Sequence, residues 1–164
     1  MERVRELALR QAAGWLTAAE LPMAAAELLA AGVGGASPAL CDLAGRSGRE
    51  PEPELLEVLR QAMDELGVEQ PESAQAERWA VRELAVRLHV GDADPAGTAA
   101  LWWRWGNSAE GGAEQGFLEV LRRACCGDCL AGRAREEAES YRRWEEELRA
   151  AAAELAGGSA GRRG

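Results

Sequence analysis

PELLEVLRQAMDELG, residues 53–67, is the most regular stretch of the sequence and the one that decides the fold class. Its apolar residues recur at the spacing of successive helical turns, which places them on one side of an α-helix. They are Leu55, Leu56, Leu59, Ala62, Met63 and Leu66. Pro53 suits the first turn of a helix and Gly67 suits its end. The spacing therefore predicts an amphipathic helix that buries one face against other helices.

The same periodicity extends to both sides of this stretch, and no segment shows the alternation that a strand requires. Turn and capping signals separate the helices. Ser37 can cap a helix that Pro38 opens, and Thr17 and Glu20 have the spacing of a capping box. The predicted helices cover residues 2–14, 22–31, 38–45, 53–67, 73–90, a short segment from 95, a segment through 117–125, and 128–156. We predict an all-α protein, an irregular or orthogonal bundle of about seven helices with a long C-terminal amphipathic helix.

The length of 164 residues favours one domain with a core of its own. We predict a single helical domain over residues 1–156. The remaining segment, GGSAGRRG at 157–164, is rich in glycine and arginine and is predicted to be a disordered tail.

The predicted C-terminal helix carries apolar or aromatic residues at a seven-residue interval, as in a coiled coil. The repeat comprises Ala134, Tyr141, Leu148 and Leu155, with Trp144 and Ala151 between them. We interpret this seam as the face that packs along the helix's own bundle. The alternative is that the helix pairs with a second copy of the chain and forms a homodimer.

Missing residue types exclude several kinds of chemistry. The chain has no Lys, so all 19 basic residues are Arg, which rules out Schiff-base and phosphate-loop lysines. His89 is the one histidine, which rules out a two-histidine zinc site within one chain. Because so few groups are suited to acid–base work at neutral pH, we expect a protein that is not an enzyme.

The formal net charge of −9 restricts the partners. Nucleic-acid binding draws on the neutralisation of phosphates, so an acidic chain is a poor candidate for it. An anionic membrane surface would also repel the chain, and no run of residues reaches transmembrane length. The start, MERVRELALRQ, lacks the apolar core of a signal peptide. We therefore expect a cytoplasmic protein with reduced thiols and, by charge, a basic protein partner.

RRACCGDCLAGRARE, residues 122–136, is the sharpest chemical feature. It contains three cysteines close together, namely Cys125, Cys126 and Cys129. One interpretation is that they are inert thiols at the turn between two helices. A second is a zinc site to which Cys41 and His89 add ligands. A third is a redox-labile pair with the spacing of a dithiol motif, and spacing does not separate the three.

LWWRW, residues 101–105, is the second unusual feature. On a helix its three indoles cover a wider arc than one core-facing stripe usually holds. Either this helix is buried nearly all round, or part of it is a binding surface, because Trp beside Arg is typical of interface hot spots. The candidate partner-binding residues are Trp102, Trp103, Arg104, Trp105, Tyr141 and Trp144.

Two functional hypotheses follow from these features. The first is a non-enzymatic, acidic helical protein-interaction module, which would act as an adaptor, a regulatory subunit or a neutraliser of a basic partner protein. The alternative is a thiol-based protein that binds zinc or responds to redox state through the CCGDC cluster.

Overall fold

The computed structural model describes residues 1–101, 109, 111–124 and 137–160. Every regular element in these residues is a helix, which confirms the all-α prediction. None of the helices in this part of the chain combines the length and apolarity that a membrane span needs. The contacts divide the chain into two compact units, Met1–Ala76 and Glu77–Gly164. The single domain over residues 1–156 stays a prediction, because a division by contacts does not measure cooperative unfolding.

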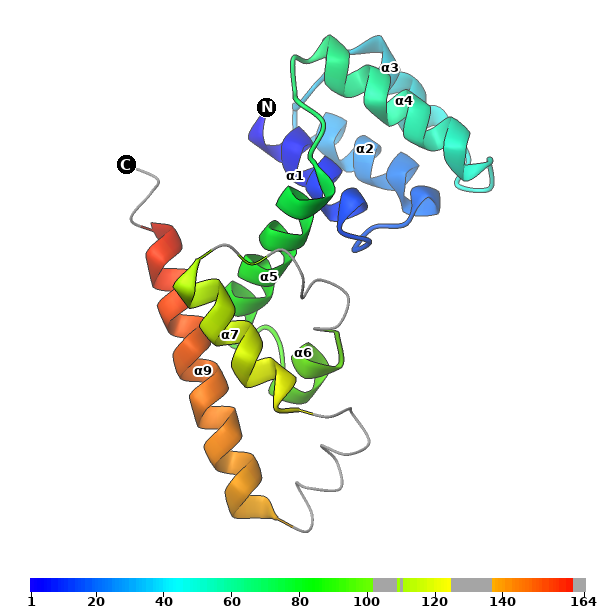
Figure 1. The fold of residues 1–164 in the computed structure, drawn as a ribbon. Helices are drawn as coiled ribbons and strands as arrows, with labels where there is room; N and C mark the ends of the chain where they lie inside the picture. The colour runs from blue at the N-terminus through cyan, green and yellow to red at the C-terminus, as the bar shows by residue number, and fades with distance from the viewer. Residues whose placement is uncertain (102–108, 110, 125–136, 161–164) are drawn as a thin grey trace. The chain divides into compact units, whose positions relative to one another are not determined.

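The first unit is built from short helices joined by tight turns (Figure 1). Its elements are α1 (Glu2–Ala12), the 3₁₀-helix η1 (Ala18–Glu20), α2 (Leu21–Ala30), α3 (Pro38–Gly45) and α4 (Glu52–Glu65). α3 packs against both α2 and α4, and α1 contacts the same two helices. The segment quoted at the outset, 53–67, accordingly falls on α4 and the turn that follows it.

Leucine and alanine fill the core of this unit. On α4 the predicted apolar stripe faces inward, and Leu55 and Ala62 have no exposed surface. Leu56 and Leu66 lie at the edge of the stripe and are partly buried. The other buried core residues are Val4, Leu7, Ala8, Leu16, Ala18, Leu21, Ala25, Ala39, Leu40, Leu43, Val58, Leu59, Met63 and Val68. α4 is therefore the amphipathic helix that its spacing predicts.

Local signals start and stop these helices as predicted. The Glu20 carboxylate accepts hydrogen bonds from the Thr17 backbone N–H at 2.8 Å and from the Thr17 hydroxyl at 2.7 Å, which is the capping box at η1. Gly14 and Gly32 follow α1 and α2 with φ of 71° and 73°, a conformation that favours glycine.

A tertiary contact strengthens the start of α3. The buried Ser37 hydroxyl accepts from the Leu40 N–H at 3.0 Å, as the sequence predicts for an N-cap, and donates to Glu65 Oε2 at 2.5 Å. The same carboxylate oxygen accepts from the Ala39 N–H at 3.0 Å. Because Glu65 is the last residue of α4, one side chain fixes the end of α4 on the beginning of α3.

The second unit contains most of α5 (Ser73–Val90), together with α6 (Pro95–Leu101), α7 (Gly112–Arg122) and α9 (Ala138–Ala160). α7 and α9 lie side by side and run in opposite directions, and α6 contacts both (Figure 1). The buried apolar residues are Ala80, Val81, Leu84, Ala85, Leu88, Ala99, Phe117, Leu118, Val120, Leu121, Ala124, Leu148, Ala152 and Leu155. Asp94 caps α6, because its Oδ1 accepts from the Gly97 N–H at 2.8 Å.

The C-terminal helix differs from its predicted limits. Residues 157–160, expected in a disordered tail, continue α9, while 161–164 lie outside the described residues. The buried Leu148 and Leu155 anchor the preceding turns of α9, and the helix continues for one more turn although Gly157 and Gly158 are exposed and glycine has a low helix propensity. The described part of the seven-residue seam thus packs within its own chain, against α7. A homodimer formed through this helix stays a prediction.

The Ser37 cap yields a first prediction. Ser37→Ala removes the acceptor for the Leu40 N–H and the hydroxyl that donates to Glu65. We expect the free energy of unfolding to fall by about 1 to 2 kcal/mol, as for other lost N-caps. Urea denaturation followed by circular dichroism measures this change. Ser47→Ala is the control, at an exposed serine of the loop after α3 whose hydroxyl accepts a local hydrogen bond from the Arg49 N–H at 3.2 Å. Its effect should be smaller, and equal effects of the two changes would contradict the proposed cap.

The Glu65 carboxylate yields a second prediction, on pH. The hydrogen bond from Ser37, followed by that from Ala39, lowers the pKa of Glu65 below its ordinary value of 4.5. A carboxyl group whose pKa is lower in the folded than in the unfolded state stabilises the folded protein at pH values above its ordinary pKa. This stabilisation is lost as pH falls through the lowered pKa. The stability difference between wild type and Glu65→Gln should therefore be greatest near neutral pH and shrink below pH 4.5.

Denaturation of both proteins at a series of pH values measures that difference. Glu69→Gln, at an exposed carboxylate just beyond α4, shows how much of the effect comes from general surface charge. A difference between wild type and Glu65→Gln that stays constant down to acid pH would contradict the role given to the Glu65 carboxylate.

Candidate functional site

The predicted thiol site lies almost entirely outside the described residues. Cys125, Cys126 and Cys129 fall in that part of the chain. Cys41 is an exposed residue of α3 in the first unit, and His89 is exposed near the end of α5 in the second. Within the described ranges, no three His, Cys, Asp or Glu side chains group closely enough to hold a metal ion. The zinc or redox site stays a prediction.

The predicted aromatic surface is described only in part. Residues 102–105, which contain three of the tryptophans, lie outside the described residues. Tyr141 and Trp144 are both partly buried on α9, with ring centroids 5.5 Å apart and planes tilted by 49°. Trp144 Nε1 donates to the Val120 carbonyl at 3.0 Å. This bond gives Trp144 a role in fixing α9 on α7, while a role in partner binding stays a prediction.

Tyr141 keeps its proton well above neutral pH. Burial raises the pKa of its phenol, and the carboxylates of Glu145 and Asp94 raise it further. Asp94 belongs to the turn before α6, so Tyr141 lies where α6 and α9 meet. The phenol is therefore a neutral hydrogen-bond donor and an unsuitable general base.

The second unit contains a buried carboxylate that the sequence analysis did not single out. Glu114, in the first turn of α7, is 2% exposed. Arg82 places Nε and Nη2 each 2.6 Å from Glu114 Oε1, and Arg78 Nε donates to Oε2 at 3.3 Å. The Gly111 N–H also approaches Oε2, at 3.4 Å. A buried charge needs such partners, because its desolvation is otherwise costly.

Helical periodicity alone places Arg78 and Arg82 off the apolar row of α5 and so toward water, yet the structure directs both to Glu114. The side chains of Arg78 and Arg82 are 25% and 37% exposed. The i,i+4 spacing of the two arginines and the position of Glu114 three residues after Gly111 were the available signals. Neither signal indicates that the two arginines contact Glu114. The contact joins α5 to α7, and it suggests no catalytic reaction.

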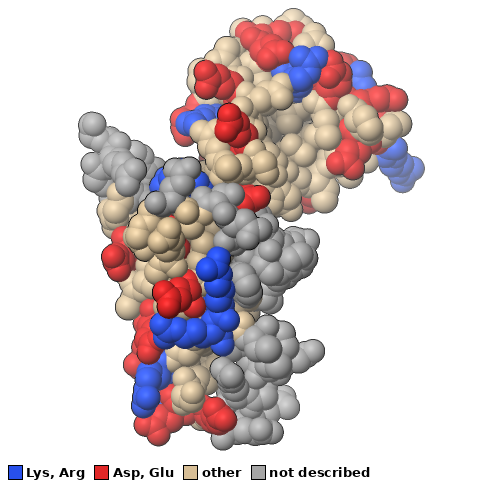
Figure 2. Space-filling view, in the orientation of Figure 1, with Lys and Arg blue, Asp and Glu red and all other residues tan. Residues whose placement is uncertain are grey.

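Negative charge is concentrated in the first unit. Residues 1–76 contain 13 acidic and 6 basic residues, a formal charge of −7 out of the total of −9. Figure 2 shows acidic side chains at many places over α1–α4, more often than basic ones. The electrostatic field of this unit therefore favours a positively charged partner.

An open groove of about 310 Å³ lies between α1 and α4 in this acidic unit. α1 contributes small or uncharged side chains to it, and α4 contributes larger apolar ones. The lining residues are Ala8, Gln11, Ala12, Pro53, Leu56, Glu57, Leu59, Arg60, Met63, Gln70 and Pro71. Its lining is mixed: apolar side chains from both helices lie beside the amides of Gln11 and Gln70 and the charged groups of Glu57 and Arg60.

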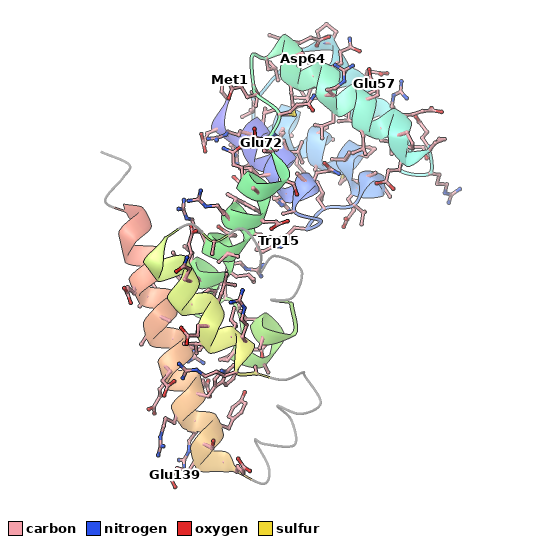
Figure 3. The ribbon with its side chains drawn as sticks, viewed as in Figure 1. Met1, Trp15, Glu57, Asp64, Glu72 and Glu139 are labelled. Carbon is pink, nitrogen blue, oxygen red and sulfur yellow. The ribbon has the colours of Figure 1, made fainter. Side chains whose placement is uncertain are left out.

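An ion-pair cluster on α4 contributes two of the groove's lining residues, Glu57 and Arg60, and Asp64 completes the cluster one turn further along the helix. Arg60 Nε donates to Glu57 Oε2 at 2.9 Å, and Arg60 Nη1 donates to Asp64 Oδ2 at 2.9 Å. The hydrogen bond from Arg60 lowers the pKa of Glu57, so this carboxylate stays ionised at neutral pH. The three side chains together have a formal charge of −1. Figure 3 shows Glu57 and Asp64 on α4.

Comparison of the chain with protein-family models, curated proteins and solved structures finds no match. The candidate site therefore rests on the residues and geometry of this chain. Of the candidate partner-binding residues, the structure brings together Tyr141 and Trp144. Spacing within one helix could not show the groove, because its two walls come from segments more than 40 residues apart.

The buried cluster yields a third prediction. Arg82→Ala removes a partner that lies 2.6 Å from Glu114 and leaves that carboxylate buried, so we expect a loss of stability on the order of 3 kcal/mol. Thermal and urea denaturation measure the loss. Arg143→Ala removes a 72%-exposed arginine of the same unit and should change stability by less than about 1 kcal/mol. Similar losses in the two variants would show that the buried pair contributes no more than a surface pair.

Proposed function

We propose that this protein is an acidic helical interaction module whose first unit binds a basic protein partner. The observation that carries the proposal is the net charge of −7 on residues 1–76, the unit that also contains the groove between α1 and α4. A net negative unit with a partly apolar groove offers a basic partner both long-range attraction and a surface to bury. An adaptor, a regulatory subunit and a neutraliser of a basic protein would all use such a surface.

The composition of the chain points in the same direction. A surface with this charge repels nucleic-acid phosphates and anionic lipids. It attracts Arg- and Lys-rich protein surfaces, and such electrostatic complementarity raises association rates and selects among partners. The proposal therefore predicts a partner of high isoelectric point and an affinity that decreases with salt.

Affinity capture tests the proposal. The immobilised full chain is exposed to a lysate of its own host, and retained proteins are quantified by mass spectrometry. We expect a basic protein to be retained by the wild type and retained about three- to thirty-fold less by Glu57→Gln/Asp64→Asn. These two carboxylates are chosen because Glu57 lines the groove, Asp64 follows the lining residue Met63, and both pair with Arg60.

The matched control is Glu139→Gln/Glu145→Gln. It removes the same charge from α9 in the second unit, where each carboxylate also pairs with an arginine four residues away. The control should retain the partner as the wild type does. Equal losses in both double variants, or a retained partner that is acidic and unaffected by salt, would overturn the proposal.

A further inference from the structure

We infer that the groove between α1 and α4 receives an amphipathic helix of the basic partner. Apolar side chains of that helix enter the groove, and its flanking Arg or Lys side chains face Glu57 and Asp64. This inference rests on the proposed function and specifies the part of the partner that the first unit recognises.

The groove is hollow because α1 presents small side chains to α4. Ala8 and Ala12 lie one helical turn apart on α1 and line the groove. Leu56 and Met63 line it from α4, seven residues or two helical turns apart. Ala8 and Met63 are buried, whereas Ala12 is exposed and Leu56 partly so. The bottom of the groove is therefore closed by buried residues, and an incoming side chain can cover the exposed apolar surface of Ala12 and Leu56.

The length of the groove suits a short helix. Its α4 wall runs from Pro53 to Met63, which corresponds to about 15 Å along a helix axis. A ligand helix of about two or three turns matches this length, with anchors at i, i+3, i+4 and i+7. The volume of about 310 Å³ is at the small end for binding sites, which favours the entry of a few side chains over that of a large cofactor.

Other modes of peptide recognition fit less well. Strand addition needs an open sheet edge, and the first unit, every residue of which the structure describes, contains helices and turns only. Recognition of a polyproline helix needs an aromatic-lined groove, and the lining residues include no aromatic side chain. An amphipathic helix is the remaining common mode that uses an apolar groove.

The edge of the groove selects the charge of the ligand. The side chains of Glu57 and Asp64 are 62% and 59% exposed, so their outer oxygens can accept further hydrogen bonds. Arg60 already donates to both of them. An incoming guanidinium or ammonium meets the net negative charge of this cluster, whereas an incoming carboxylate is repelled by it.

A synthetic peptide tests the inference. The probe is a helix of about 14 residues with Leu at i, i+3, i+4 and i+7 and Arg and Ala elsewhere. Calorimetry gives its affinity for the full chain and for Ala12→Leu, which fills the groove from α1. We expect Ala12→Leu to bind about ten-fold more weakly or worse. An otherwise identical peptide with Glu in place of Arg should not bind the wild type.

Ala30→Leu is the matched control. Ala30 is the last residue of α2 as Ala12 is of α1, both are exposed, and Ala30 does not line the groove. This variant should bind the Arg peptide as the wild type does. Amide chemical shifts of the wild type provide a readout that needs no variant: Ala12 and Leu56 should shift on titration, and Ala30 should not.

The outcomes separate this inference from the proposed function. Equal binding by both variants, shifts away from the groove, or no binding of the peptide would each overturn the helix-in-groove inference. A basic protein that is still captured through Glu57 and Asp64 would leave the proposed function standing. If the peptide binds the groove but capture finds no basic partner, the proposed function fails and the groove's preference for a basic helix stands.

Discussion

The backbone N–H groups at helix starts are the constraint on which this structure depends. An all-helical chain with short helices has many of them, and no carbonyl within the same helix can accept their hydrogen bonds. Carboxylates fill this need at several places: Glu20 accepts from the Thr17 N–H, Asp94 from the Gly97 N–H, and Glu65 from the Ala39 N–H. Glu65 also joins α3 to α4. The side chains that complete the local structure thus contribute to the tertiary structure as well.

Much of the helical framework can be predicted from the sequence, because its signals are local. A cap and the N–H that it serves lie within three or four residues, as Ser37 and Leu40 do, and both are visible in one short window. The limits of α5, 73–90, match their prediction for the same reason. At residues 157–160 the local signal fails, because α9 continues through two glycines that predict its end.

Contacts between distant segments could not be predicted in this way. Arg82 and Glu114 are 32 residues apart, and each one is typical of an exposed helical face when considered alone. The groove between α1 and α4 depends on which helices become neighbours. Ala12 lies one helical turn from the buried Ala8, yet it is exposed at the groove. The net charge of −9 likewise does not show that most of the negative charge lies in residues 1–76, because only the contacts define that unit.

The ion pairs described above have a further consequence, because arginine supplies the cation in each of them. Arg46 pairs with Asp42 and Glu50, and Arg60 pairs with Glu57 and Asp64. The guanidinium group keeps its proton far into alkaline solution, whereas an ammonium group would begin to lose it near pH 10. Both members of these pairs therefore stay charged over the alkaline pH range in which ion pairs of lysine weaken. The electrostatic ties of this fold should persist in base, and alkaline unfolding would have to begin at groups other than its ion pairs.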